Sequence, residues 1–388
     1  MIKFLFTSKI KNILKQYENI NDPFVLRKKL SLNFTAEECR VISSQIFLRK
    51  KAKKKFLQAN QMFFDTEGLE QASSWFMAKY HASFPEENDV VLDICTGIGA
   101  DAAAFALKAN KVITLDNNKN KQILATENIK NIANKFNIEF INKKFEDYNP
   151  SAEITFVYAD PSRREKSKRK IDFNEYSPKV SEIISFAEKN NIADKKCLVK
   201  LAPACDYDSL LSKGKIQVVS CNGEVKEVLF IMTKKEAGKK EAVLLADEEK
   251  VFVLESKKHI TKKVSEKLKF IIEPDAAIIR AGLVAEYAEK IGASFIEPHI
   301  AYLTSNNENI GPGGKVFCIM EHMQYNEKKI KRFLKKKGIK KITVKKRGIN
   351  KTTENINKEL SIKSGSNKTY LFVFRSEKTH ECIIAEKI

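Results

Sequence analysis

The stretch VVLDICTGIGAD, residues 90–101, decides the fold of this chain. An apolar run that closes with Asp93 is followed by Gly97 and Gly99, and then by an alanine-rich segment of helical composition. A strand that leads through a glycine loop into a helix is typical of open α/β sheets, which bind ligands at the carboxyl ends of their strands. The glycines allow the backbone to approach such a ligand closely. The stretch therefore predicts an α/β domain with a ligand-binding loop.

Short apolar runs and amphipathic helices alternate on the carboxyl side of this stretch. The runs expected to be strands are KVITLD (111–116), IEFINKKF (138–145), ITFVYAD (154–160), CLVKLA (197–202), QVVSC (217–221) and VKEVLFIM (225–232). The helices expected between them include ADAAAFALKA, KQILATENIKNIANKF and PKVSEIISFAEKN. A strand, helix, strand order at this spacing implies parallel pairing with right-handed crossovers. We therefore predict a doubly wound α/β core.

The two ends of the chain have a different pattern. Residues 1 to about 60 carry apolar positions every three or four residues and predict helices, with a break at NDPF (21–24). After the core we expect a hairpin formed by EAVLLA and KVFVLES, and then a long helical stretch that ends at Gly292. GPGG, residues 311–314, predicts a boundary. Beyond it lies a small basic unit of alternating strands and helices, in which KITVKKRG (341–348) is a strand that ends in a basic loop.

The net charge of +21 is unevenly distributed along the chain. Residues 1–60 hold 14 Lys and Arg against 4 Asp and Glu, and residues 315–388 hold 20 against 7. Residues 61–314 hold 36 against 38, so all the excess positive charge lies in the two ends. Neutralisation of phosphates by Lys and Arg supplies most sequence-independent affinity for nucleic acids, so the asymmetry favours a nucleic-acid partner. The alternative is a general lysine bias, since 60 Lys stand against 10 Arg and charge covers any solvent face.

Composition and length exclude several other classes of protein. The 388 residues, 43% hydrophobic and 31% charged, suffice for two or three domains with a sizeable core. No run approaches the roughly 18 to 20 apolar residues of a membrane helix, and the N-terminal segment lacks a cleavage site, so we expect a cytoplasmic protein. The seven cysteines are scattered without a CxxC pair, and the five histidines form no HExxH cluster. We therefore expect neither a disulfide framework nor a metal site.

Acidic residues stand at the ends of the first three expected strands. A dinucleotide site would need GxGxxG, and an acid beside it would repel a pyrophosphate. The loop reads DxCxGxG instead, and Asp93 suits a ligand that carries an amino group, such as the methionine end of S-adenosylmethionine. Asp116, at the end of the second strand, is placed to accept hydrogen bonds from ribose hydroxyls, and Glu146 or Asp147, after the third, from an adenine amino group. The alternative is a doubly wound domain that binds NAD or no ligand.

With these residues the segment resembles the class I S-adenosylmethionine-dependent methyltransferases. Further stretches resemble a bacterial methyltransferase family with a THUMP-like C-terminal domain, namely TEGLEQASSWFMAKYHA (66–82), VYADPSRR (157–164), EPDAAIIRAGL through EPHIAYLTSN (273–306) and KITVKKRG (341–348). The resemblance implies a basic N-terminal helical domain (1–80), a Rossmann-like methyltransferase core (81–272), a ferredoxin-like segment (273–314) and a basic THUMP-like domain (315–388). THUMP domains proper bind RNA, which agrees with the charge distribution.

The residues expected to hold S-adenosylmethionine lie in the glycine loop, at the strand ends and just before the core. They are Gln71, Asp93, Cys95, Thr96, Gly97, Gly99, Asp116, Glu146 and Asp147. Cys95 stands where small residues are usual, and we interpret it as a packing residue rather than a nucleophile. Gln71, with Ser73 and Ser74, is expected to close over the methionine carboxylate, and an N-cap for the following helix is the alternative role of this segment.

The fourth strand ends in DPSRR, residues 160–164, at the position where amino-group methyltransferases that act on bases carry D/N-P-P-Y/F. In that motif the acid and backbone carbonyls orient the target nitrogen, and the aromatic ring stacks on the flipped base. Asp160 is therefore the expected catalytic residue, and the alternative is that it only shapes the loop. Arg163 replaces the aromatic residue and is expected, with Arg164, to bind substrate phosphates or to stack on a base. The expected RNA contacts are completed by Lys345, Lys346 and Arg347.

Two cysteines and one histidine allow other readings of the chemistry. Cys205 and Cys221 each follow or end a strand, where a thiolate could activate a pyrimidine ring. Free cysteines are more often small buried residues, however, and the strand order is wrong for Cys221. His299 is assigned to structure, because no acidic or cysteine-rich sequence lies beside it at metal-ligand spacing.

Together these features predict an S-adenosylmethionine-dependent methyltransferase that modifies a nucleotide in structured RNA, such as tRNA or rRNA. Two alternatives stay open. One is an RNA-binding protein with a vestigial methyltransferase core, which the departure at Arg163 keeps in view. The other is a methyltransferase that acts on a protein or a small molecule, which would bind the cofactor without affinity for RNA.

Overall fold

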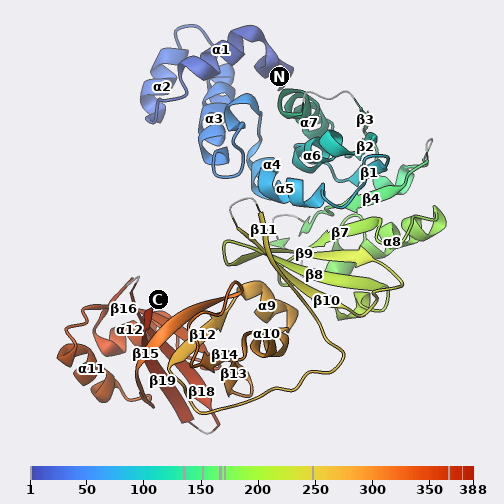
Figure 1. Cartoon of the computed structure of the whole chain (residues 1–388). Coiled ribbons are helices and arrows are strands. Elements are labelled where there is room, and N and C mark those ends of the chain that lie inside the picture. The colour runs from blue at the N-terminus through green and yellow to red at the C-terminus, as the bar shows by residue number, and fades with distance from the viewer. Residues whose placement is uncertain are drawn as a thin grey trace. The chain divides into compact units, whose positions relative to one another are not determined.

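The computed structural model describes residues 2–133, 137–150, 153–165, 168–169, 172–246, 249–365, 368–377 and 379–388 (Figure 1). The chain divides into two compact units. Unit 1 comprises Met1–Gly214 and Leu229–Ala237, and unit 2 comprises Lys215–Val228 and Gly238–Ile388.

Helices form the first part of unit 1, as the apolar spacing predicts (Figure 1). They are η1 (Ile2–Phe6), α1 (Ser8–Gln16), α2 (Pro23–Leu30), α3 (Ala36–Ala52), η2 (Ala59–Gln61), α4 (Thr66–Gln71) and α5 (Trp75–His81). Local chemistry sets where they begin, because Thr7, Asp22 and Thr35 each accept a hydrogen bond from a backbone N–H of the first turn. Thr35 and Glu38 also form a reciprocal capping box at the start of α3.

A parallel sheet follows in unit 1, in the order β7-β4-β1-β2-β3. Its strands are β1 (Val90–Ile94), β2 (Lys111–Leu115), β3 (Ile138–Ile141), β4 (Phe156–Ala159) and β7 (Cys197–Leu201). The connections contain α6 (Ala100–Lys108), α7 (Lys119–Ile132), η3 (Phe145–Asp147), β5 (Arg164–Glu165), β6 (Lys168–Arg169), η4 (Phe173–Glu175) and α8 (Val180–Lys189), and η5 (Asp208–Leu210) follows β7. The chain adds β2 and β3 on one side of β1, and then β4 and β7 on the other. This reversal confirms the predicted doubly wound core and places the switch point between β1 and β4.

Close packing explains the composition of α6. All residues from Ala100 to Ala106 are buried, and small side chains let the helix approach its neighbours closely. Gly99, just before the helix, has a φ of +86°, and a Cβ there would lie 3.0 Å from the Cβ of Ala125 on α7. Glycine is therefore required both by the backbone conformation and by the contact. The same packing fixes the start of α6 next to the loop that follows β1.

The first strands of unit 2 lie in the sequence before and after the second segment of unit 1, Leu229–Ala237. β8 (Gly214–Cys221) pairs in parallel with β10 (Lys240–Ala246), and β10 pairs antiparallel with β11 (Glu249–Glu255). β9 (Glu224–Met232) is divided, since the boundary between the units falls within it. The β10–β11 pair is the hairpin that the sequence predicts.

A second sheet of eight strands occupies the rest of unit 2, in the order β13-β14-β12-β15-β19-β18-β16-β17. Its strands are β12 (Phe270–Pro274), β13 (Ser294–Glu297), β14 (Ile300–Ser305), β15 (Gly314–Gln324), β16 (Lys341–Arg347), β17 (Lys363–Ser364), β18 (Thr369–Ser376) and β19 (Thr379–Lys387). The accompanying helices are α9 (Ala276–Ala281), α10 (Val284–Ile291), α11 (Glu327–Lys336) and α12 (Thr353–Leu360). Because β12 pairs with β15, residues 273–314 and 315–388 contribute strands to one sheet. Where the four expected domains begin and end stays a prediction.

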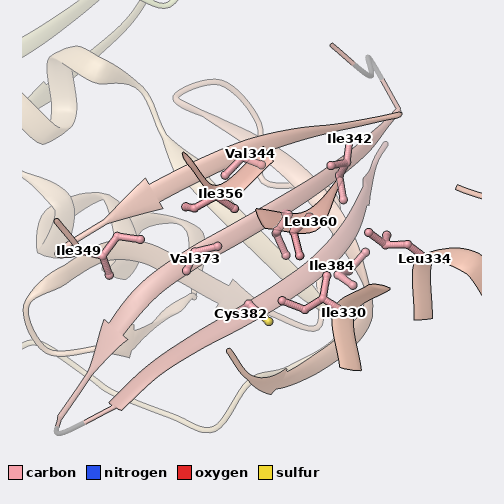
Figure 2. Close-up of a cluster of buried hydrophobic side chains, with 11 residues drawn as sticks. Ile330, Leu334, Ile342, Val344, Ile349, Ile356, Leu360, Val373, Cys382 and Ile384 are labelled. Carbon is pink, nitrogen blue, oxygen red and sulfur yellow. The ribbon is translucent and has the colours of Figure 1, made fainter. Parts of the chain in front are cut away.

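Apolar side chains of α11 and α12 pack against strands of this sheet in one buried cluster (Figure 2). Ile330 and Leu334 stand four residues apart on α11, and Ile356 and Leu360 repeat that spacing on α12, so each pair lies on one side of its helix. The strands contribute side chains such as Val373. Six of the other eight positions of α11 are Lys or Arg, so this helix is buried on one side and charged on the other.

Candidate active site

A cavity of about 1040 Å³ lies at the carboxyl ends of the parallel strands of unit 1. The residues that follow β1, β2 and β4 line it, together with η3 and the end of α4. Nine of the predicted site residues are on its wall: Gln71, Cys95, Thr96, Gly97, Asp116, Glu146, Asp147, Asp160 and Arg163. Segments that are far apart in the sequence therefore converge on one site.

Backbone hydrogen bonds hold the loop after β1 in place. The N–H groups of Cys95 and Thr96 both donate to the carbonyl of Leu115 at the end of β2, at 2.9 and 3.1 Å. Cys95 has a φ of +69°, a strained conformation for a residue with a side chain, of the kind found at functional sites. Gly97 also has a positive φ, and a Cβ there would meet no other atom closer than 4.0 Å, so its missing side chain leaves room for a ligand against the backbone.

The thiol of Cys95 has the properties of a packing residue. Loss of solvent around the thiol, together with the charges of Asp116 and Asp160, raises the pKa of Cys95. A thiol with a raised pKa stays protonated and is a poor nucleophile. This agrees with the interpretation of Cys95 from the sequence.

Asp116, the residue after β2, is fixed by two backbone N–H groups. Its Oδ2 accepts from Gly97 at 2.9 Å, and its Oδ1 accepts from Asn118 at 2.8 Å. Burial raises the pKa of Asp116, while these two hydrogen bonds act in the opposite direction. Each carboxylate oxygen can accept a second hydrogen bond, so the oriented carboxylate is able to receive a pair of ligand hydroxyls.

Asp93 lies behind the loop and not on the cavity wall. Its side chain is 1% exposed, and its Oδ2 has no hydrogen-bond partner among the described residues. Burial raises the pKa of Asp93 well above its usual range, and the nearby charges of Asp101, Asp160 and Asp116 act in the same direction. A carboxyl group that is kept protonated in this way can ionise when a ligand brings positive charge close to it, so the site fits a cationic ligand. S-adenosylmethionine brings such charge with its sulfonium and ammonium groups.

The segment after β3 brings charges of both signs to the cavity. Glu146 and Asp147 lie in η3 and are on the wall, as are Lys143 and Lys144 just before them. Lys121 reaches the same wall from α7. The carboxylates can accept hydrogen bonds from an amino group, and the ammonium groups can bind anions.

Gln71 reaches the cavity from the end of α4. Its side-chain amide donates to Glu67 at 3.0 Å and accepts from Lys121 at 3.4 Å. Ser74, in the same segment, accepts from the N–H of Met77 and caps α5. The N-cap that was the alternative role of this segment is thus formed by Ser74.

Asp160 follows β4 and forms an ion pair that the sequence analysis did not anticipate. Its Oδ2 lies 2.8 Å from the Nζ of Lys200 on β7. Ser162 and Ser177 close the next part of the loop through two backbone hydrogen bonds, at 2.8 and 3.1 Å. Arg163 lies on the cavity wall, whereas the side chain of Arg164 is outside the described part of the chain.

A buried polar chain continues from Lys200. Its Nζ donates to the Oγ of Ser73 at 3.0 Å, and Ser73 donates to the Oδ2 of Asp101 at 2.9 Å. The Oδ1 of Asp101 lies 2.7 Å from the Nδ1 of His81, and the hydroxyl of Tyr158 lies 3.1 Å from the same nitrogen. All five side chains are buried. Burial acts to raise the pKa of Asp101, but the neighbouring His81 and Lys200 outweigh it and lower that pKa.

Sequence reasoning missed this chain of residues, although one of them carries a signal. Lys200 is a charged residue in the otherwise apolar strand CLVKL, and lysine is rarely buried unless it is paired. Ser73, His81 and Asp101 have no comparable signal, because residues of these types are common at helix starts and ends.

Four other residues singled out in the sequence lie off the cavity wall. Gly99 precedes α6, and Cys205 is fully buried after the wall residues Ala202, Pro203 and Ala204. Cys221 ends β8 in unit 2, and His299 lies in an exposed position between β13 and β14. Neither cysteine is therefore at the cavity surface.

The basic residues at the end of β16 have partners within unit 2. Lys345 and Arg347 approach the carboxylate of Glu273 at 2.6 and 3.7 Å. The Nζ of Lys346 donates to the carbonyl of Ile349. Two of the three RNA contacts predicted at the end of β16 are thus already paired with a carboxylate.

A larger group of exposed cations lies on α11 and in the chain just after it. No ion pair joins any of them to another residue in the part of the chain that the structure describes. We call this group the α11 basic surface, and its members are Lys328, Lys329, Lys331, Arg332, Lys335, Lys336, Lys337, Lys340 and Lys341.

Two sequence comparisons agree with this picture of the chain. Residues 314–387 match a family model described as THUMP domain-like. An uncharacterized S-adenosylmethionine-dependent methyltransferase of Mycobacterium tuberculosis, found in strains CDC 1551 and H37Rv, is 25% identical over 280 residues. The aligned part covers 71% of this chain and 74% of that relative.

A solved structure shares the fold over nearly the whole chain. It is the crystal structure of a candidate methyltransferase from Porphyromonas gingivalis W83, with a TM-score of 0.80 and 22% identity. The match covers 98% of this chain and 97% of that one.

The doubly wound core, the cavity at its switch point and these likenesses define the class of protein. The chain is a class I S-adenosylmethionine-dependent methyltransferase with a THUMP-like C-terminal domain. The predicted family resemblance, fold class, enzyme class and cofactor are thereby confirmed.

Two kinds of feature are absent from the described residues. Within those ranges, no helix has the length and apolar character needed to cross a membrane. The same ranges contain no group of three or more His, Cys, Asp or Glu side chains that could hold a metal ion.

Proposed function

We propose that this protein transfers the methyl group of S-adenosylmethionine to a nucleotide in structured RNA, such as tRNA or rRNA. The observation that supports an RNA substrate is the α11 basic surface, which lies within the region that matches a THUMP-like domain. Such a substrate agrees with a cytoplasmic location.

In this proposal the strand ends of unit 1 hold the cofactor. Asp116 accepts from the ribose hydroxyls, and Glu146 or Asp147 accepts from the adenine amino group. Asp93, whose raised pKa keeps it protonated behind the loop, ionises when the cationic end of the ligand binds. The neighbouring contacts come from Gln71, Cys95, Thr96, Gly97 and Gly99. When bound, S-adenosylmethionine supplies an electrophilic methyl group for an in-line displacement, so the protein contributes mainly by positioning the reactants.

Asp116→Ala is expected to weaken S-adenosylmethionine binding by about 1–3 kcal/mol, because a pair of ribose hydrogen bonds is lost. Titration calorimetry measures the effect on protein stripped of bound ligand, with NADH as the control ligand. Asp208→Ala, which removes an exposed carboxylate of η5, is the matched control and should leave the affinity unchanged. Equal affinities for Asp116→Ala and the unmodified protein would refute the ribose assignment.

Asp160 would contact the target nucleotide at the cavity wall. Only its Oδ2 has a hydrogen-bond partner within the described ranges, so Oδ1 is available to accept from an amino or hydroxyl group of the substrate. Such a contact orients the lone pair of the attacking atom toward the methyl group. Arg163, where base methyltransferases carry an aromatic ring, can stack on a base or bind a phosphate, and Arg164 is proposed to assist.

The α11 basic surface has the chemistry of a contact with a phosphate backbone. Buried Ile330 and Leu334 hold the helix against its sheet, so its cations are presented from a fixed support. Affinity for polyanions grows with the number of phosphates that are neutralised and counterions that are released. Lys345 and Arg347 form ion pairs with Glu273, so we expect α11 to contribute more to RNA affinity than the end of β16 does.

A triple variant tests this surface. Lys328, Arg332 and Lys335 follow helical spacing along one side of α11, and their joint replacement by Gln should weaken tRNA binding about tenfold or more and lower the salt slope by about 3. Filter binding at about 50 and 200 mM salt measures both quantities. The matched control replaces the exposed Lys189, Lys234 and Lys235 of unit 1 by Gln. Equal losses in the two triple variants would contradict a specific role for α11.

The same samples separate the alternatives. RNA binding without transfer of a tritiated methyl group to any RNA would indicate an RNA-binding protein with a vestigial core. Cofactor binding together with a flat salt response would indicate a protein or small-molecule substrate.

A further inference from the structure

We infer that Lys200 is a positioning residue for methyl transfer. It holds the carboxylate of Asp160 in one orientation at the cavity wall, and it is itself held by Ser73 and Asp101. This inference rests on the proposed role of Asp160 in the reaction. It assigns a function to the buried polar chain that begins at Lys200 in unit 1.

The strand register places Lys200 beside Asp160. β4 and β7 run parallel, with Val157 opposite Cys197 and Ala159 opposite Val199. The same register, continued by one residue, places Asp160 opposite Lys200. The distance between the Oδ2 of Asp160 and the Nζ of Lys200 is 2.8 Å. Lys200 is 8% exposed and is absent from the cavity wall, so it acts on a substrate only through Asp160.

The surroundings of Lys200 restrict its side chain to one arrangement. A buried ammonium group requires acceptors, and those of Lys200 include Asp160 and Ser73. Ser73 is in turn bound to Asp101, whose second oxygen is engaged by His81. Because each contact uses a directed hydrogen bond, displacement of Lys200 would disturb both ends of the chain.

A fixed carboxylate matters more for the rate than for cofactor binding. Positioning an attacking atom within a fraction of an ångström accounts for much of what an enzyme contributes to a displacement, and small misplacements cost up to about a hundredfold in rate. The cofactor contacts proposed for Asp116 and Gly97 join each other and do not involve Lys200. Loss of Lys200 should therefore lower kcat and leave the affinity for S-adenosylmethionine unchanged.

Lys200→Met keeps a long, unbranched side chain and removes its charge. We expect kcat for transfer of a tritiated methyl group to fall about tenfold to a hundredfold, with an unchanged Kd for S-adenosylmethionine. The RNA probe is the unfractionated RNA of cells that lack this protein. Lys200→Arg, which restores a cation, should recover part of the lost rate. Ser73→Ala is a milder variant, and it should lower kcat less while the protein stays folded.

Lys196→Met is the matched control. Lys196 pairs with Asp89 at 2.7 Å and stands just before β7, at the opposite end of the strand from Lys200. A merely structural role for Lys200 would make the two Met variants alike, each with a lower melting temperature and an unchanged kcat. That result would overturn the inference.

Asp160→Asn separates the failure of this inference from the failure of the proposed function. If Asp160→Asn loses activity while Lys200→Met and Ser73→Ala keep the full rate, the inference is wrong and the role of Asp160 stands. If Asp160→Asn keeps the full rate, or if the unmodified protein transfers no methyl group to RNA, the proposed function is wrong and the inference falls with it.

Discussion

Asp160→Asn lowers the rate of methyl transfer by at least about a hundredfold in single-turnover measurements, if Asp160 orients the target atom as proposed. Asn has the same shape, but it carries no charge to pair with Lys200 and presents a donor where the carboxylate has acceptors. The target group then loses its fixed orientation. S-adenosylmethionine binding should stay unchanged, because the oriented carboxylate of Asp116 is anchored separately by Gly97 and Asn118. Rapid quench with a tritiated methyl donor and calorimetry measure the two quantities.

Asp89→Asn is the control for this variant. Asp89 also pairs with a lysine, Lys196, and it lies at the amino end of β1, away from the cavity wall. Its replacement should change the melting temperature and not the rate. A similar loss of rate in both variants would show that Asp160→Asn acts through the fold rather than through the substrate.

The part of this site that sequence predicts is encoded locally. The order of strand, glycine loop and helix over residues 90–101 predicts the turn, because positive φ values favour glycine and small residues suit a packed helix. An acid directly after a parallel strand, such as Asp116, stands at the ligand edge of the sheet whatever the rest of the chain does. Residues that directly follow the parallel strands therefore come together at the cavity.

The buried polar chain that begins at Lys200 depends on contacts that no local pattern contains. Ser73 and Asp101 are 28 residues apart, and Ser73 and Lys200 are 127 apart, so their hydrogen bonds arise from tertiary packing. The same limit applies to Lys345 and its partner Glu273, which are separated by 72 residues. Charge counting along the sequence treats a paired lysine and an unpaired one alike. It predicts a basic C-terminal unit, but it does not distinguish the end of β16 from α11.

Asp93 illustrates a third limit, which concerns burial. The sequence places it beside the ligand loop, and the structure puts its carboxylate behind that loop with Oδ2 unpartnered among the described residues. Its effect on a ligand is therefore the effect of a buried ionisable group rather than of a direct contact on the cavity wall. That distinction has a measurable consequence for stability.

Asp93→Asn should make the cofactor-free protein more stable and weaken its binding of S-adenosylmethionine about tenfold or more. Removing a buried carboxylate that lacks a partner is worth about 1 kcal/mol or more. For a unit of this size that raises the melting temperature by about 2–4 °C per kcal/mol. The same change removes the carboxyl group that ionises when the cationic end of the cofactor binds. Calorimetric melting and titration of the ligand-free protein measure the two effects.

Asp101→Asn is the matched control, and the pKa directions of the two acids predict opposite signs. An unfolded chain loses the proton of an aspartate near pH 4, whereas the folded protein keeps the proton of Asp93 to higher pH. Between the pKa of the unfolded chain and the raised pKa of the folded protein, the folded state binds more protons, so its stability falls as the pH rises. Above the raised pKa this loss of stability stays constant. The pKa of Asp101 is lowered, so its ionised form stabilises the fold above pH 4 and Asp101→Asn should lower the melting temperature. Lower melting temperatures for both variants would mean that Asp93 is paired in solution. In that case the affinity for the cofactor should not increase with pH. An unpaired Asp93 instead releases its proton to the solvent when the cation binds, so the affinity should increase with pH.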